Sequence, residues 1–215
     1  MLVFAAANLV LFAVPKTGST AYHLALRSKA DIVLAGKASI KHLTLRKYER
    51  HFAPYLEQAH GLVPERVAVI RDPLDYLRSW YRYRQRPDGP ADSKRVRDMG
   101  FDAFVLATLE RRPPPFAKIG TQRAFVAGRD GQIRVEHLFA YERPMALRGF
   151  LSERLGFAIK PAQKNVSPPA ETAISAAVEA EFQQAMAADV ALHQRILAAG
   201  GHLVTPTGAV VDEAG

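Results

Sequence analysis

The sequence predicts an α/β protein with a central, mainly parallel sheet of about four or five strands flanked by helices. Short apolar runs of strand length alternate along the chain with longer segments of helical spacing. The length of 215 residues suits one such domain with a sizeable core. No linker or internal repeat divides residues 1–215, so we expect a single domain.

The expected elements follow one another in a regular order. Apolar runs predict strands over 9–14, 31–36, 66–71 and 133–141. Helical spacing predicts helices over 21–27, 41–59, 73–84, 101–110, 144–155 and 170–199, the last of them open to a break. Asp72 and Pro73 are typical of a helix N-terminus, and Gly156 of a helix end. The glycines and prolines within 85–100 predict a loop.

Composition and charge limit the possible functions. The chain has no cysteine, and its seven histidines lack a metal-ligand spacing, so we expect neither disulfides nor a metal site. A net charge of +8 is typical either of a solvated basic surface or of a protein that attracts an anionic cofactor, an acidic glycan or a nucleic acid. No run has the length of a membrane span. The apolar run 1–7 lacks the basic start of a signal peptide, and we expect it to form a hairpin with 9–14. These observations favour a cytoplasmic location.

A cluster of small polar residues follows the strand predicted over 9–14. The run 15–20 reads Pro-Lys-Thr-Gly-Ser-Thr and leads into the helix predicted from residue 21. The first N–H groups of a helix lack internal partners, and the helix dipole favours an anion beside them. Lys16 adds a positive charge, and Gly18 allows close approach of the backbone. Hydroxyl donors come from Thr17, Ser19 and Thr20. The run therefore predicts a site for phosphate or a similar anion.

This run differs from the nucleoside-triphosphate P-loop, in which Lys directly follows the second Gly of G-x-x-x-x-G-K-[ST]. Here Lys16 precedes Gly18, and the loop has no earlier Gly. The run instead resembles the 5′-phosphosulfate loop of sulfotransferases that use 3′-phosphoadenosine-5′-phosphosulfate (PAPS). The resemblance implies a three-layer P-loop-like fold and a bacterial or carbohydrate-type member of that family.

A second motif strengthens the resemblance. In these sulfotransferases the third strand of the core ends in Arg, and the next helix carries Ser eight residues later; the two bind the 3′-phosphate of PAPS. Arg71 and Ser79 have that spacing. Arg71 ends a predicted parallel strand, where α/β folds bind ligands, and its planar fork suits phosphate. A looser likeness covers 164–168, which matches an Asn-x-Ser loop that closes over the cofactor in carbohydrate-type members. It implies cofactor binding by Lys164, Asn165 and Ser167.

The resemblance implies transfer of the sulfuryl group from PAPS to a hydroxyl or amine by in-line displacement. Lys16 is the candidate for the oxygen between phosphate and sulfate, and the loop 16–20 for the 5′-phosphate. For the general base we favour His42, which follows the strand predicted over 31–36 and titrates near neutral pH. The family uses either His or Glu in this role, so a carboxylate remains an alternative. Lys41 is a candidate for the same site.

The acceptor is expected to be a small molecule or a glycan. Arg78, Arg82 and Arg86 form either a basic wall for an acidic acceptor or a solvated helix face, and 121–123 is a candidate for contact with acceptor or adenine. Two other functions stay open, a nucleotide kinase and a non-catalytic nucleotide-binding protein. The order of Lys16 and Gly18 disfavours the kinase. We expect no nucleic-acid partner, because no basic-aromatic stacking platform is evident.

Overall fold

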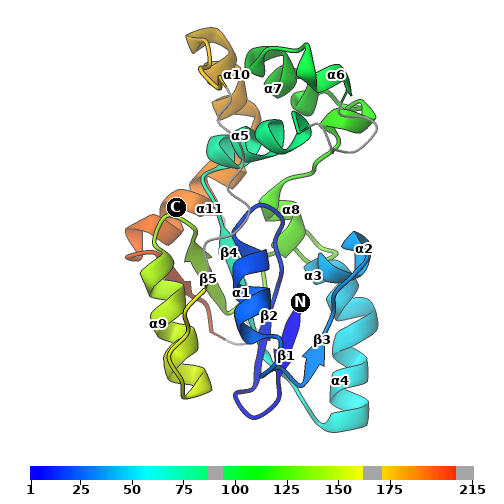
Figure 1. Ribbon diagram of the computed structural model, residues 1–215, viewed down its shortest axis with the longest axis vertical. Coiled ribbons are helices and arrows are strands. Elements are labelled where there is room, and N and C mark those ends of the chain that lie inside the picture. Colours follow the sequence, from blue (N-terminus) through cyan, green and yellow to red (C-terminus); the bar gives the residue numbers. More distant parts are fainter. Residues whose placement is uncertain (87–93, 162–170, 207–215) are drawn as a thin grey trace.

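The computed structural model describes residues 1–86, 94–161 and 171–206. It has an α/β architecture with a six-stranded sheet in the order β3-β1-β2-β4-β5-β6 (Figure 1). The strands are β1 (Leu2–Phe4), β2 (Leu9–Leu11), β3 (Ile32–Val33), β4 (Glu65–Ile70), β5 (His137–Ala140) and β6 (His202–Val204). The sheet is mixed, which corrects the expectation of a mainly parallel sheet of about four or five strands.

Two antiparallel strands account for the difference. β1 pairs antiparallel with both β2 and β3, and β6 pairs antiparallel with β5. The expected hairpin supplies β1, with Asn8 in the left-handed region at φ 48°. β2, β4 and β5 are parallel to one another. β3 runs in the same direction, because β1 lies between β3 and β2 in the sheet and is antiparallel to both. The carboxyl ends of β2, β3, β4 and β5 therefore reach the same edge of the sheet.

The helices occur near the expected positions. Along the first half of the chain they are α1 (Ser19–Leu26), α2 (Ala38–Lys41), α3 (Leu45–Lys47), the π-helical segment η1 (Tyr48–Phe52), α4 (Ala53–His60) and α5 (Pro73–Arg84). Then follow α6 (Lys94–Arg97), α7 (Phe101–Leu109), the 3-10 helix η3 (Pro115–Ala117), α8 (Gln122–Val126), α9 (Pro144–Leu155), α10 (Ala176–Ala185) and α11 (Ala187–Ala198). The helix expected over 41–59 is thus divided among several short pieces, and the last predicted helix breaks at Met186. α6 lies within the loop expected over 85–100, of which 87–93 fall outside the described residues.

Successive residues of the strands point to opposite faces, and each face has its own core. Val10, Ala68 and Leu138 pack with residues from α3, η1, α4, α8 and α11. Leu9, Val67 and Phe139 face the other way and pack with residues from α1 and α9. The sheet is therefore flanked by helices on both sides.

A third apolar cluster lies beyond the sheet. It joins buried residues of α5, α6, α7, η3 and α10, with Phe104 and Phe182 fully buried. Figure 1 shows α5, α6, α7 and α10 grouped at one end of the molecule, past the carboxyl ends of the parallel strands. Of this helical group, α5 also borders the edge at which β2, β4 and β5 end.

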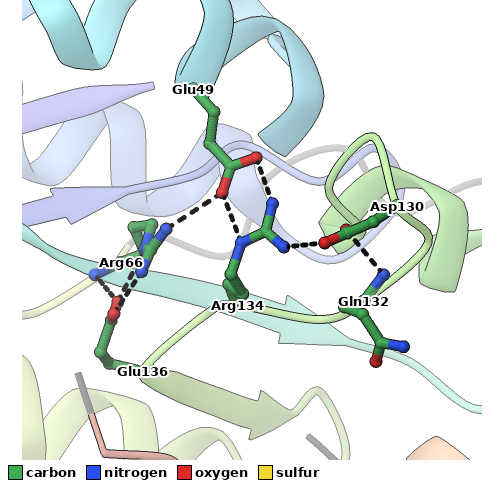
Figure 2. Close-up of polar contacts among 6 residues, drawn as sticks. All are labelled: Glu49, Arg66, Asp130, Gln132, Arg134 and Glu136. Carbon is green, nitrogen blue, oxygen red and sulfur yellow. Dashed lines mark hydrogen bonds and ion pairs between the residues drawn. The ribbon is translucent and has the colours of Figure 1, made fainter. Parts of the chain in front are cut away.

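An ion-pair network fixes η1 to the sheet (Figure 2). Arg66 forms a bidentate pair with Glu136, whose side chain is only 4% exposed, and also reaches Glu49 at 3.3 Å. Arg134 binds both oxygens of Glu49, at 3.0 and 2.9 Å, and also contacts Asp130. Each carboxylate is paired, so burial of these charges is compensated. Removing one partner would leave an uncompensated charge beside the sheet.

No helix within the described ranges is both long enough and apolar enough to cross a bilayer.

Candidate active site

The carboxyl ends of the strands open onto a cleft of about 940 Å³. The segments that follow β2, β3, β4 and β5 all contribute lining residues, as expected for strands that end at one edge. One face of α5 and the segment after η3 complete it. The predicted site residues that line this cleft are Lys16, Gly18, Ser19, Thr20, His42, Arg71 and Ser79. Residues separated by 63 positions in the chain are thus brought to one place.

The loop after β2 has an unusual backbone. Gly18 is the N-cap of α1 at φ 72°, and Lys16 also lies in the left-handed region at φ 61°. This conformation costs a non-glycine residue about 1–2 kcal/mol and needs support from its surroundings. Arg71 supplies that support, because its Nη1 donates a hydrogen bond to the carbonyl oxygen of Lys16 at 2.9 Å. A strained turn held in this way directs the start of α1 toward the cleft.

Thr17 has a different role from the one expected. Its side chain is buried, and its Oγ1 donates a hydrogen bond to the carbonyl oxygen of Val14 at 2.9 Å. It does not line the cleft. The hydroxyl therefore stabilises the turn from inside, whereas Ser19 and Thr20 line the cleft.

Lys16 extends toward the aromatic face of α5. Its Nζ lies 4.4 Å from the ring centroid of Tyr83 and 5.6 Å from that of Trp80. Burial, and to a smaller extent the charges of Arg86 and Arg71, together lower the pKa of Lys16 to about 8. Lys16 is therefore mainly a cation at pH 7, but less strongly so than an exposed lysine. An anion bound beside it would raise its pKa.

The guanidinium of Arg71 is held on three sides. Its Nε donates to Asp75 at 2.6 Å, and its Nη1 donates to the Lys16 carbonyl. Its flat face lies 4.3 Å from the ring centroid of Tyr141, the residue directly after β5. A guanidinium has five N–H donors, and Asp75 and Lys16 use three of them. Two donors remain for a ligand in the cleft.

The backbone of Arg71 is fixed by a buried amide. Gln122 is 2% exposed and accepts a hydrogen bond from the Arg71 N–H at 2.9 Å, while its own amide donates to the Arg71 carbonyl at 2.6 Å. Its neighbour Thr121 is the N-cap of α8 and accepts from the Ala124 N–H. Residues 121–123 are the candidate for contact with acceptor or adenine. In the structure Gln122 holds the backbone of Arg71, and Thr121 caps α8.

A second polar contact holds the start of α5. Asp72 caps the helix by accepting from the Asp75 N–H at 2.8 Å, as its sequence position predicts. The Asp72 N–H in turn donates to Glu142 at 2.8 Å, and Glu142 pairs with the buried His193 of α11 at 2.9 Å. Burial alone would raise the pKa of Glu142, but the hydrogen bonds from His193 and Asp72 outweigh it and lower that pKa. The turn from β4 into α5 is therefore tied to the sheet edge and to α11.

His42 directly follows α2 and lines the cleft. Its Nδ1 lies 2.6 Å from the Ala13 carbonyl oxygen, which can only accept, so Nδ1 carries the proton and Nε2 carries the lone pair of the neutral ring. Burial lowers the pKa of His42, and the charge of Lys41 adds to this, although the contact with Ala13 opposes it. Near neutral pH the side chain is therefore an uncharged proton acceptor. Lys41 itself donates to the Thr20 hydroxyl at 3.0 Å.

Sequence reasoning missed several aromatic residues of this site. Tyr83 lies four positions after Ser79 on α5, and Trp80 lies three positions before Tyr83, so helical spacing could have placed Tyr83 beside Ser79 and Trp80 beside Tyr83. Tyr141 ends β5 as Arg71 ends β4, so the rule for carboxyl ends could have found it too. Of the basic wall expected on α5, Arg86 lines the cleft, whereas Arg78 donates to the Thr172 carbonyl. Lys164, Asn165 and Ser167 lie outside the described residues.

Comparison of the chain with protein-family models, with curated proteins and with solved structures found no match.

Loss of the Gln122 amide should destabilise the fold at the site. Gln122→Ala leaves the N–H and carbonyl of Arg71 without their partners, so we expect the free energy of unfolding to fall by roughly 1–3 kcal/mol. Urea denaturation followed by circular dichroism measures this. Gln58→Ala, at an exposed position of α4, is the matched control and should stay within about 0.5 kcal/mol of the parent. Equal stability of both variants would mean that Arg71 does not depend on Gln122.

Proposed function

We propose that this chain is a PAPS-dependent sulfotransferase. The observation that supports this best is the convergence of three features in one cleft. They are the strained loop with Lys16, the strand-end guanidinium of Arg71 with Ser79 in the same lining, and the neutral imidazole of His42. A donor with anionic groups at two positions and an acceptor that must lose a proton would use all three.

The proposal includes a P-loop-like fold. In favour of it, β2, the anion loop and α1 follow one another directly, and β4 lies parallel to β2 as its neighbour. This arrangement delivers Lys16 and Arg71 to the same edge. The antiparallel strands β1 and β6 are additions on either side of that parallel centre.

The residues of the cleft suit PAPS as the sulfuryl donor. Ser19, Thr20 and the first N–H groups of α1 would hold the 5′-phosphate, with Lys16 beside it. The two remaining donors of Arg71 and the hydroxyl of Ser79 would hold the 3′-phosphate. The carboxylate of Asp75 does not block phosphate binding by Arg71, because it occupies only one edge of the guanidinium.

The reaction is a single displacement at sulfur. The acceptor oxygen or nitrogen forms a new bond to sulfur while the bond from sulfur to the bridging phosphate oxygen breaks, and adenosine 3′,5′-bisphosphate leaves. His42 takes the acceptor proton at Nε2, because Nδ1 is committed to Ala13. Lys16 stabilises the negative charge that grows on the departing phosphate oxygen. Each role needs the protonation state that this site favours near pH 7.

Two other functions use part of the same site. A nucleotide kinase would bind ATP, and a non-catalytic nucleotide-binding protein would need no base. The kinase would also need a carboxylate for Mg²⁺ near the transferred group, and no Asp or Glu is among the described residues that line the cleft. The sulfotransferase accounts for His42 as well as for both anion sites.

The nucleotide preference should depend on the 3′-phosphate. We expect adenosine 3′,5′-bisphosphate to bind about ten- to a hundredfold more tightly than AMP, since a hydrogen-bonded charge pair is worth roughly 1.5–3 kcal/mol. Isothermal titration calorimetry measures both affinities. Arg71→Ala should bring the two values together, while Arg27→Ala, an exposed arginine of the α1 C-terminus, should preserve the difference. Equal affinities in the parent protein would contradict the 3′-phosphate site.

The rate should depend on pH with two separate limits. The base works when His42 is neutral, and because burial lowers its pKa, kcat/KM with PAPS and a saturating acceptor should decline on the acid side only below about pH 6.5. Lys16 must be charged, so kcat/KM should decline again near pH 8. His42→Gln should lower turnover by about a hundredfold or more and remove the acid limit, and Lys16→Met should remove the alkaline limit. An acid limit that persists in His42→Gln would assign it to the 3′-phosphate of the donor and remove His42 as the base.

A further inference from the structure

A small cavity lies between the sheet and α1, next to the loop after β2. Its volume is about 20 Å³, which is room for a single water molecule. Most of its described lining is apolar and comes from the strands and α9. No Asp, Glu, Lys or Arg belongs to that lining, so a neutral ligand suits the cavity better than an ion. The polar side chains that line it are Thr17, Ser19, Tyr22 and His23.

His23 brings an unpaired ring nitrogen to this cavity. The residue is 9% exposed, and its Nε2 is buried with no hydrogen-bond partner among the described residues. Burial lowers the pKa of His23, so the ring is neutral near pH 7. Nε2 of a neutral ring is a donor in one tautomer and an acceptor in the other. Because a buried polar atom without a partner is unfavourable, and water can both donate and accept, a water molecule would satisfy Nε2 in either tautomer.

Ser19 connects this cavity to the cleft. Of the residues that the structure describes, it alone lines both. Ser19 precedes His23 by four positions on α1, so the two side chains lie on the same face of the helix. The neighbouring hydroxyl of Thr17 already donates its proton to the Val14 carbonyl and can only accept from a further partner. A water molecule bonded to His23 is therefore placed to act on the Ser19 hydroxyl.

We infer that the cavity binds one water molecule between His23 Nε2 and the Ser19 hydroxyl, and that His23 is thereby a positioning residue for Ser19. The water fixes the direction of a hydroxyl that would otherwise rotate freely. Resting on the proposed function, that hydroxyl is one of the groups that hold the 5′-phosphate. His23 does not line the cleft, so its effect on a bound nucleotide is indirect.

A high-resolution crystal structure of the chain without nucleotide tests the water site. We expect one water molecule within about 3.2 Å of both His23 Nε2 and Ser19 Oγ. The structure of His23→Phe should lack this water, because the new ring has no polar atom to bind it. A parent protein with no water in the cavity, or with Nε2 bonded directly to a protein group, would overturn the inference. A water bonded to His23 but not to Ser19 would overturn the positioning role.

A double-mutant cycle tests whether His23 acts through Ser19. By calorimetry, His23→Phe should weaken the binding of adenosine 3′,5′-bisphosphate about two- to tenfold, the range for one neutral hydrogen bond. In a Ser19→Ala background the same change should have almost no further effect, because the hydroxyl that it acts through is gone. Equal losses with and without the Ser19 hydroxyl would contradict the inference. His51→Phe, at an exposed position of η1, is the matched control and should stay within about twofold of the parent.

His23→Gln separates positioning from packing. Its amide can bond the same water, so its affinity for the nucleotide should stay within about twofold of the parent. Equal losses in the Gln and Phe variants would mean that the ring matters only for packing, and would overturn the positioning role. Failure of the parent to bind adenosine 3′,5′-bisphosphate would instead reject the proposed function. The parent crystal structure needs neither nucleotide nor variant, so it still decides whether the water is bound.

Discussion

A single hydrogen bond joins the two halves of the candidate site. Arg71, at the end of β4, donates to the carbonyl oxygen of Lys16 in the loop after β2. Lys16 has a left-handed backbone that its side chain disfavours, so the loop depends on this external support. The guanidinium that steadies the loop also keeps two donors for a ligand. The geometry of the loop after β2 is thereby coupled to the geometry at the end of β4.

Several contacts keep Arg71 where that bond requires it. Asp75 and Tyr141 hold the side chain, and Gln122 holds the backbone. The pair of Glu142 and His193 ties the adjacent helix start to α11. An arginine restrained in this way loses little conformational freedom when an anion binds, so more of the interaction energy appears as affinity.

The cleft also carries an electrostatic cost in the free protein. Burial and cationic neighbours lower the pKa of Lys16, and burial lowers that of Lys41, so each cation is held in surroundings that disfavour its charge. Anions that bind there relieve this repulsion and stabilise the fold by mass action. The network of Glu49, Arg66, Arg134 and Glu136 lies apart from the cleft and has its charges paired (Figure 2). The charges of this network are thus paired within the fold, whereas most cationic side chains among the described lining of the cleft have no carboxylate partner there.

The sequence predicted those parts of the molecule whose signals are local. The strand before residue 15, the loop, and the helix capped by Asp72 each have a composition that indicates their structure, and the loop and strand end together located the cleft. The hairpin of β1 with β2 was expected, whereas β6 has only three residues, and so short a run indicates neither a strand nor its pairing direction. Gln122 reaches Arg71 across 51 positions, and no local pattern signals such a contact. Thr17 shows the same limit, because its neighbours in sequence do not reveal that its hydroxyl turns inward.

The proposed function depends most on where a doubly phosphorylated nucleotide binds. A crystal structure of the chain with adenosine 3′,5′-bisphosphate tests this directly. We predict that the 5′-phosphate lies at the N-terminus of α1 beside Lys16, and that the 3′-phosphate contacts Arg71 and Ser79, with His42 left free to meet an acceptor. A nucleotide bound outside this cleft, or one whose 3′-phosphate lies away from Arg71, would contradict the account.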